Sequence, residues 1–292
     1  MQQDQRDQQD QLDNKSNKKC GFVAVFGETN SGKSSLINAM VGQKVSIVSR
    51  KIQTTLTRTL GIAIRGDSQI IFVDTPGFLR QNSRESLSKI AWDAFRKSTE
   101  AMFVVDASRK NFDSSIRLLE RIDKERKLTL VINKVDLVHK PLLLGMAEKF
   151  SNIRIFQEIF MTSAIEPSGI DDILRHFDAR LPFGEWLYAA DEITDSSFEK
   201  YTSEITREHI YHRLHQEIPY KCVVETGHYQ QQEDGSVKIV QNIYVKSNRH
   251  KTIFLGAGGS KIKAIGEAAR RELTELLQRE VHLFLHVLLQ SD

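Results

Sequence analysis

The stretch Gly27-Glu28-Thr29-Asn30-Ser31-Gly32-Lys33-Ser34 follows the apolar run 22–26 and leads into Ser35 and further helix-forming residues. This order predicts a strand, a tight loop and a helix. The GxxxxGKS spacing lets backbone N–H groups fold around phosphate oxygens, while Lys33 reaches the terminal phosphates and the Ser34 hydroxyl can ligate Mg²⁺. The positive end of the following helix adds to the attraction. The stretch therefore predicts a nucleotide-phosphate site.

A second motif, Asp74-Thr75-Pro76-Gly77, ends the apolar run 70–73. A carboxylate at the end of a strand can hold Mg²⁺ through water, and the free N–H of a glycine can sense a γ-phosphate. Asp74 and Gly77 are therefore candidates for the metal and switch parts of phosphoryl transfer.

A third motif, Asn133-Lys134-Val135-Asp136, follows the apolar run 128–132. Only guanine offers Asp136 the adjacent N1–H and exocyclic N2–H₂ donors. After one more strand-like run, Thr162-Ser163-Ala164 can supply a backbone N–H to the guanine carbonyl. The four motifs in this order predict binding of GTP and GDP, with a generic ATP site as the weaker alternative.

Bulk properties allow two domains of ordinary size, since the chain has 292 residues and 40% hydrophobic content. No apolar run is long enough for a membrane span, and no secretion signal is visible. Cys20 and Cys222 lack metal-ligand spacing and are expected to be free thiols. The net charge of +3 is too small to identify a partner.

The chain divides into four predicted regions. Residues 1–19 are polar, with Leu12 as the one aliphatic side chain, and predict a disordered tail. Residues 20–180 alternate strand-like and helical stretches, which predicts an α/β domain with a mostly parallel sheet and helices on both faces. Residues 181–204 read as a linker, and residues 205–292 form a second domain.

The second domain shows the order α-β-β-α-loop-α-β, in which the loop is Gly256-Ala257-Gly258-Gly259. Its helix is predicted over 205–217, its first strand over 220–226, and its last strand over 281–289. This order is that of an α+β type-2 KH module, whose GxxG loop clamps the backbone of single-stranded RNA. A glycine is needed there because a Cβ would block the close approach of phosphates.

Charge favours the RNA-binding interpretation over that of a solvated surface. Between Lys238 and Arg271 there are eight Lys/Arg residues and one acid, Glu267. The basic residues nearest the loop in sequence are Lys246, Arg249, Lys251, Lys261 and Lys263. Such a one-sided balance is typical of a phosphate-backbone partner.

These residues resemble the Era family of bacterial GTPases (TrmE-Era-EngA-like GTPases with a C-terminal type-2 KH domain), and the match covers nearly everything after residue 20. The features that carry it include the stretches 49–55 (SRKIQTT), 74–78 (DTPGF), 191–195 (DEITD) and 217–220 (EIPY). The resemblance implies a GTP-hydrolysing factor for 30S ribosomal-subunit assembly that binds the 3′ region of 16S rRNA. It also implies a cytoplasmic monomer with peripheral association at the inner membrane.

The resemblance assigns further roles. Thr55, or Thr54, would close over Mg²⁺ in the GTP state, and Asn30 would help to hold K⁺ beside the phosphates. Phe78 stands where many GTPases place a glutamine, and an apolar ring cannot orient water, so slow intrinsic hydrolysis is expected. Catalysis would then rest on Lys33, Thr55, Gly77 and Asn30.

The chain departs from the family pattern at Thr29 and Ser31, where a proline and a valine are usual, and its C-terminus is short. The short end puts some RNA contacts and the membrane role in question. Two alternatives stay open. One is an RNA chaperone with negligible GTP turnover, and the other is a related GTPase that acts on another RNA or at the membrane.

Overall fold

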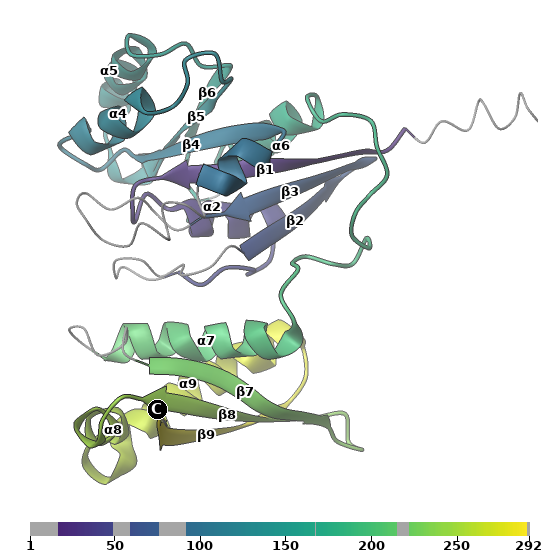
Figure 1. Cartoon of the computed structure of the whole chain (residues 1–292), viewed down its shortest axis with the longest axis vertical. Helices are drawn as coiled ribbons and strands as arrows, with labels where there is room; N and C mark the ends of the chain where they lie inside the picture. Colours follow the sequence, from purple (N-terminus) through teal and green to yellow (C-terminus); the bar gives the residue numbers. More distant parts are fainter. Residues whose placement is uncertain (1–16, 49–58, 76–91, 167, 215–221, 291–292) are drawn as a thin grey trace, which may run out of the picture. The chain divides into compact units, whose positions relative to one another are not determined.

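The computed structural model describes residues 17–48, 59–75, 92–166, 168–214 and 222–290, which fold into two compact units (Figure 1). One unit comprises the chain up to Gln43 together with Thr55–Thr194. The other comprises Lys44–Thr54 together with Asp195–Asp292. Residues 1–16 of the expected tail (1–19) lie outside the described residues. The first strand begins at Lys19, the last residue of that expected tail.

The first unit is built on a six-stranded sheet with the order β2-β3-β1-β4-β5-β6. All neighbouring strands run parallel except β2 and β3, which form an antiparallel hairpin. Strands buried on both faces read as continuous apolar runs, as the sequence of this sheet does. The strands are β1 (Lys19–Gly27), β2 (Thr59–Arg65), β3 (Ser68–Asp74), β4 (Glu100–Asp106), β5 (Thr129–Asn133) and β6 (Glu158–Thr162).

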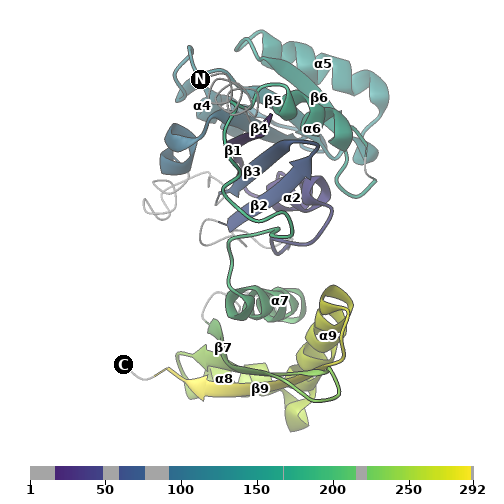
Figure 2. The ribbon, with the colours of Figure 1, turned by 90° about the vertical axis from the view of Figure 1, so that its right-hand side faces the viewer.

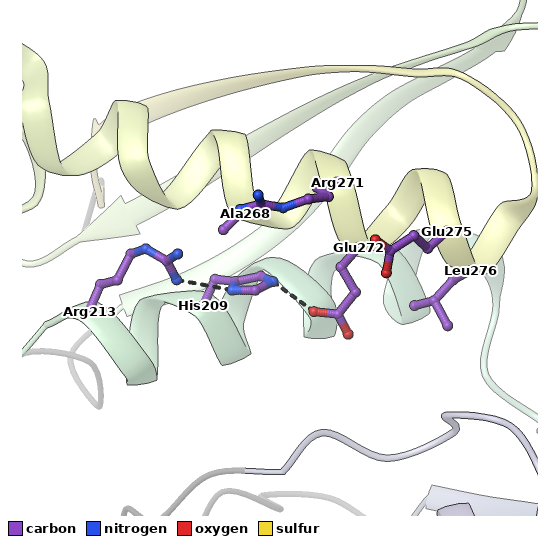
Figure 3. Close-up of a pocket in the computed structure, with 7 residues that line it drawn as sticks. All are labelled: His209, Arg213, Ala268, Arg271, Glu272, Glu275 and Leu276. Atoms are coloured by element: carbon purple, nitrogen blue, oxygen red, sulfur yellow. Dashed lines mark hydrogen bonds and ion pairs between the residues drawn. The ribbon is translucent and has the colours of Figure 1, made fainter.

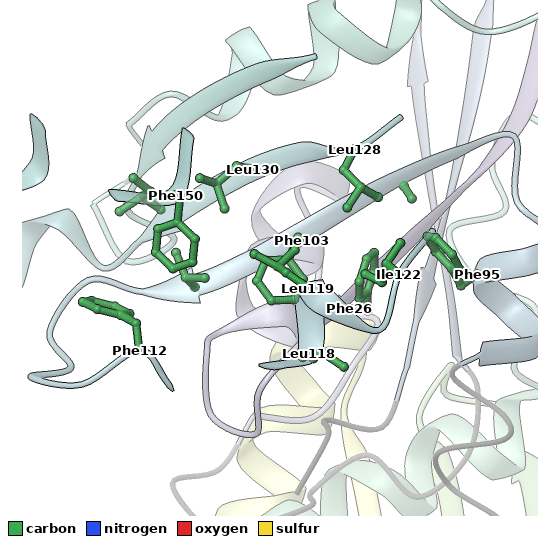
Figure 4. Packing of buried hydrophobic residues seen from close by; sticks show 14 of the residues in the cluster. Phe26, Phe95, Phe103, Phe112, Leu118, Leu119, Ile122, Leu128, Leu130 and Phe150 are labelled. Carbon is green, nitrogen blue, oxygen red and sulfur yellow. The ribbon is translucent and has the colours of Figure 1, made fainter. Parts of the chain in front are cut away.

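Helices cover both faces of this sheet. The helices are α2 (Lys33–Val41), α4 (Asp113–Glu120), α5 (Lys140–Ser151) and α6 (Ile170–Asp178). On one face, Leu119 of α4 and Phe150 of α5 pack with Phe26 and Phe103 of the sheet (Figure 4). On the other face, the ring of Phe177 in α6 meets Phe72 of β3 edge-to-face. This two-sided burial holds the strand ends in fixed positions.

The parallel strands end along one edge of the sheet. β1, β3, β4, β5 and β6 end at Gly27, Asp74, Asp106, Asn133 and Thr162. In open α/β sheets, ligands bind beside the carboxyl ends of the strands. The motifs found in the sequence therefore share this edge.

The region 181–204, predicted as a linker, is partly ordered structure. The Gln69 side chain donates to the Tyr188 carbonyl (2.8 Å) and accepts from the Leu187 and Tyr188 amides. The Ile62 amide donates to the Ile193 carbonyl (2.9 Å). The boundary between the two units falls inside this region, after Thr194. The part before that boundary is hydrogen-bonded to sheet residues, which the sequence did not predict.

The helix predicted over 205–217 is α7 (Phe198–Arg213), which begins earlier and inside the predicted linker. Ser197 caps it, since the serine hydroxyl accepts from the Lys200 amide at 3.3 Å. A serine N-cap is a readable start signal that the apolar spacing alone does not give.

The second unit packs helices on one face of a three-stranded sheet. The sheet has the order β7-β8-β9, with β7 antiparallel and β9 parallel to β8. Figure 2 shows α7 and α9 along the same face. The elements that follow α7 are β7 (Cys222–Gln231), β8 (Val237–Val245), α8 (Asn248–Leu255), α9 (Ser260–Leu277) and β9 (Val281–Leu289), in the predicted order.

The core of this unit lies between the sheet and the helices. Ile210 of α7, Phe254 of α8 and Ile265 of α9 pack against Ile243 of β8 and its neighbours. β7 runs five residues beyond its predicted end, past a bulge between Thr226 and His228. The residue at the bulge is Gly227, a residue that often marks a bulge in a strand.

A polar contact also joins α7 and α9 (Figure 3). His209 Nε2 lies 2.7 Å from Glu272 Oε2, and Arg213 donates to His209 Nδ1 at 3.1 Å. Burial raises the pKa of Glu272, but His209 and Lys44 outweigh it and lower the pKa to about 2. Glu272 is therefore held as a carboxylate that pairs with Lys44 and contacts His209.

Two sequence predictions can be checked against the described residues. Cys20 and Cys222 are free thiols, as predicted. Among the helices described, none has both the length and the apolar character needed to cross a membrane.

Candidate functional site

The loop between β1 and α2 is shaped for close approach of an anion. Gly27 and Gly32 have φ values of 150° and 93°, and Asn30 also adopts a positive φ, 63°. A Cβ on Gly27 would lie 2.3 Å from the Val104 carbonyl oxygen, so the position excludes any side chain. No side chain caps α2. The N–H groups in the first turn of a helix attract phosphate oxygens.

Lys33 lies inside this loop, and its side chain is buried. Its ammonium donates to the carbonyls of Gly27 (3.3 Å) and Glu28 (2.9 Å). Burial lowers the pKa of Lys33 to about 8, although the nearby Asp74 carboxylate opposes that shift. A bound phosphate would supply the buried ammonium with an anionic partner.

Ser34 and Asp74, predicted as metal ligands, are brought together from α2 and β3. The Ser34 hydroxyl donates to Asp74 Oδ2 at 2.7 Å. Asp74 is fully buried, and Thr75 beside it donates to the Val25 carbonyl (2.8 Å). A hydroxyl and a carboxylate are oxygen ligands of the kind that Mg²⁺ prefers, so this pair fits that ion.

The guanine motif is connected directly to the phosphate loop. Asn133 ends β5, is buried, and donates through Nδ2 to the Ser31 carbonyl at 3.0 Å. A Cβ on Gly32 would lie 2.2 Å from that same Nδ2. Asn133 therefore connects the guanine motif to the phosphate loop.

Lys134 forms a second link. It takes a positive φ of 65°, and its ammonium donates to the Asn30 carbonyl (2.8 Å) and to Asp106 Oδ2 (2.5 Å). After Val135 the chain enters a short 3₁₀ helix, η1 (Val135–Leu137), in which Asp136 is exposed. The exposed Asp136 carboxylate, close in sequence to Asn133, can accept hydrogen bonds from a base.

The Thr162-Ser163-Ala164 motif lies next to Asn133. Thr162 pairs with Asn133 in the β5–β6 register, and its hydroxyl approaches Asn133 Oδ1 at 3.5 Å. Ser163 accepts from the Glu166 amide (3.1 Å), which closes the turn that contains Ala164. The structure thus gathers all four motifs, as far as they are described, at one edge of the sheet.

Thr54, Thr55, Pro76, Gly77 and Phe78 lie outside the described residues. Thr29 lies within the phosphate loop and Ser35 follows it, and both are half-buried.

Sequence reasoning missed residues that anchor the phosphate loop from outside. The buried Glu28 carboxylate forms an ion pair with Arg109 and accepts from the Ser115 hydroxyl (2.6 Å). Arg109 also donates to the Thr29 carbonyl (2.5 Å). Asp106, the partner of Lys134, ends an apolar run just as Asp74 does, and that position could have revealed it. Arg109 has no such signal, since its partner is distant in sequence.

The GxxG loop of the second unit is open to solvent. Gly256, Gly258 and Gly259 all have positive φ values, and a Cβ on Gly258 or Gly259 would meet nothing within 4 Å. A Cβ on Gly256 would lie 2.7 Å from the Lys261 side chain. Ala257 between them is exposed.

The basic residues predicted around this loop come from three adjacent places. Lys246 follows β8, Arg249 and Lys251 lie on α8, and Lys261 and Lys263 lie in the first turn of α9. All are exposed except Lys251, which is half-buried, and Lys263 lies 3.9 Å from Glu267. The open loop with a basic rim is suited to a phosphate backbone.

Comparisons with known proteins agree with this geometry. Residues 22–134 match the family model described as "50S ribosome-binding GTPase", and residues 217–291 match the KH domain. The chain is 42% identical over 277 residues to GTPase Era of Brucella suis biovar 1, covering 94% of this chain and 89% of the relative. It is 43% identical to GTPase Era of Sinorhizobium medicae, with the same coverage of both chains.

Solved structures give the same result. A crystal structure of Era in complex with MgGDPNP and nucleotides 1506–1542 of 16S ribosomal RNA matches with a TM-score of 0.85 and 30% identity, over 94% of this chain and 95% of that one. A structure of an Aquifex aeolicus Era variant bound to GDP·AlF₄⁻ matches with a TM-score of 0.83 and 31% identity, over the same shares of both chains. The chain, a P-loop GTPase domain followed by a KH domain, belongs to the Era family of GTPases.

Proposed function

We propose that this GTPase is a nucleotide-controlled switch that binds the 3′ region of 16S rRNA and acts in assembly of the small ribosomal subunit. The observation that carries the nucleotide part is the bond from Asn133 to the Ser31 carbonyl, because it joins guanine recognition to the phosphate loop. The RNA part is supported by the open, basic GxxG loop and by the rRNA fragment bound in the similar Era structure.

Mg²⁺ would be held by Ser34 and Asp74, with Thr55 as the third proposed ligand. When bound, it would neutralise charge on the phosphoryl oxygens of GTP. Lys33 would bind the same phosphates from inside the loop, and the N-terminal N–H groups of α2 would orient them. These groups stabilise charge at the point where it develops during phosphoryl transfer.

Slow intrinsic hydrolysis follows from the residue after Gly77, since Phe78 cannot orient a water molecule. We further propose that Asn30 helps to hold K⁺ beside the phosphates. Turnover measured in potassium and in sodium chloride of equal ionic strength tests this role. Equal rates in the two salts would exclude it.

The nucleotide assignment is tested by Lys33→Ala. Removing the buried ammonium should weaken GTP binding or raise the activation free energy of hydrolysis by several kcal/mol. Normal turnover in this variant would refute the phosphate-loop assignment. Turnover of the parent with and without an rRNA 3′-end fragment separates a switch from a chaperone that hardly hydrolyses GTP.

The RNA assignment is tested by Gly258→Asp with Gly259→Asp. Both positions have room for a side chain, and aspartate tolerates positive φ better than most residues. Carboxylates there should repel RNA phosphates, whereas the matched Asn/Asn variant adds the same bulk without charge. Full affinity of the Asp/Asp variant for the rRNA fragment, or binding of the parent that is insensitive to salt, would contradict the clamp.

Three further proposals follow from the partner. A factor that acts on ribosomal subunits would work in the cytoplasm. We also expect it to be a monomer, and cell fractionation tests whether it associates peripherally with the inner membrane.

Nucleotide control requires that RNA affinity differ between GDP and a non-hydrolysable GTP analogue. Equal affinities would leave two tethered, independent binding domains. Crosslinking to cellular RNA distinguishes 16S rRNA from another RNA target.

A further inference from the structure

The face of the β7-β8-β9 sheet that points away from the helices carries an unusual set of side chains. Burial alternates along β8, where Ile239, Gln241 and Ile243 are fully buried and the residues between them are not. The strand register places four outward positions on each strand, twelve in all. The buried core of this unit is made by the opposite face.

Aromatic and imidazole rings occupy five of these twelve positions: His228, Tyr244, His282, Phe284 and His286. Three of them alternate along β9, where side chains on one face recur about every 6.6 Å. Phe284 at their centre is 48% exposed, and His282 and His286 are also exposed. A large ring left in solvent at the centre of a sheet is an available stacking surface.

Two lysines and one acid lie on or beside this face, which gives it a small positive balance. Lys238 is the second residue of β8 and Lys246 follows its last residue, both in the outward alternation. Glu225 is the one acid among the twelve positions. The Lys238 ammonium lies 5.6 Å from the centroid of the Phe284 ring. Rings flanked by lysines combine stacking on bases with attraction to phosphates.

A protein partner fits this face less well. Val223, Tyr244 and Leu288 form one apolar row at one end of the face, and Val240 pairs with Phe284. The other outward positions are mainly polar, so the apolar surface does not extend over the whole face. Rings, two amides (Gln230 and Asn242) and lysines make the combination with which sheet surfaces bind unpaired bases.

We propose that this outward sheet face is a second binding surface for single-stranded RNA, on which bases stack on Phe284, His282 and His286. The site is separate from the GxxG loop, although both would serve the proposed RNA-binding function. A single strand clamped at the loop can continue past Lys246 onto the face, because β8 leads through that residue into α8.

The test uses two fluorescein-labelled oligoadenylates and the full chain. One has about four nucleotides, the length that a KH loop clamps, and the other has about twelve. Phe284→Leu keeps an apolar side chain but removes the ring, and Phe284→Tyr keeps the ring as a matched control. Phe284→Leu should weaken binding of the long probe by about five- to hundredfold, as expected for a lost stacking contact. The short probe should bind equally to both variants and to the parent.

Three outcomes would overturn the proposal. The long probe could bind Phe284→Leu as tightly as the parent, or Leu and Tyr could weaken it equally. Light scattering could also show that Phe284→Leu disrupts a dimer while RNA affinity is unchanged, which would assign the face to a second copy of this chain. Failure of the GxxG clamp would be seen in a different measurement. The short probe would then bind the Gly258→Asp, Gly259→Asp variant as tightly as the parent.

Discussion

Replacing Gly32 by alanine tests whether the phosphate loop and the guanine motif form one mechanical unit. The new Cβ would lie 2.2 Å from Asn133 Nδ2, so Asn133 must move and release the Ser31 carbonyl. Loss of that buried hydrogen bond costs about 1–3 kcal/mol. Holding alanine at a left-handed φ costs a further ~1–2 kcal/mol. The expected total is about 2–5 kcal/mol.

This cost can appear in either of two measurements. If the free protein keeps its loop geometry, the cost appears as a lower free energy of unfolding. If the free loop relaxes, the cost appears on binding, as weaker affinity for a fluorescent GDP analogue. The sum of the two losses is what the geometry predicts, so both urea unfolding and nucleotide titration are needed.

Gly42→Ala provides the matched control. Gly42 also has a positive φ, 77°, but a Cβ there would meet nothing within 4 Å. It should show the strain alone, about 1–2 kcal/mol. In an Asn133→Ala background, Gly32→Ala should likewise cost little more than the strain, giving a coupling energy of about 1–3 kcal/mol. Additive effects, or equal losses at Gly32 and Gly42, would refute the reasoning.

Three other outcomes are expected. Asp136→Asn should weaken GTP binding and favour xanthosine nucleotides, whose C2 carbonyl accepts from the new amide; competition between the two nucleotides measures this, and unchanged GTP affinity would exclude Asp136 as the base reader. Burial, with help from Arg180, lowers the pKa of the buried His176 from 6.5 to about 4. The unfolded chain therefore takes up a proton on this imidazole near pH 6.5, whereas the folded chain does so only near pH 4. The free energy of unfolding should drop by about 2 kcal/mol from pH 7 to pH 5, and His176→Gln should remove that drop in urea unfolding. Arg109→Ala should lower the free energy of unfolding by about 3 kcal/mol or more, because the buried Glu28 carboxylate loses its ion-pair partner. Adding Glu28→Gln to this variant should restore part of that stability, and no recovery would argue against the ion pair.

The sequence alone determined the nucleotide motifs and the order of elements, for a local physical reason. A phosphate loop works through backbone N–H groups, glycine torsions and one lysine that are contiguous in the chain, so its chemistry is readable without a fold. The same holds for Asn133 and Asp136, which follow directly from a buried strand. The GxxG loop between two helices is readable for the same reason.

Element ends were less predictable. The start of α7 at Phe198 depends on a single serine cap, and the length of β7 depends on a bulge that the partner strand tolerates. The stretch 187–193 read as a linker because its hydrogen bonds go to Gln69 and Ile62, which are more than a hundred residues away.

The residues that support the site from outside the motifs became visible through tertiary contacts. Arg109 meets Glu28 across 81 residues, and Asn133 meets the Ser31 carbonyl across 102. Such pairs depend on how the sheet orders its strands, and no local pattern encodes that order. The outward face with Phe284 is likewise visible only once β9 is paired with β8, because register decides which alternate residues face the helices and which face solvent.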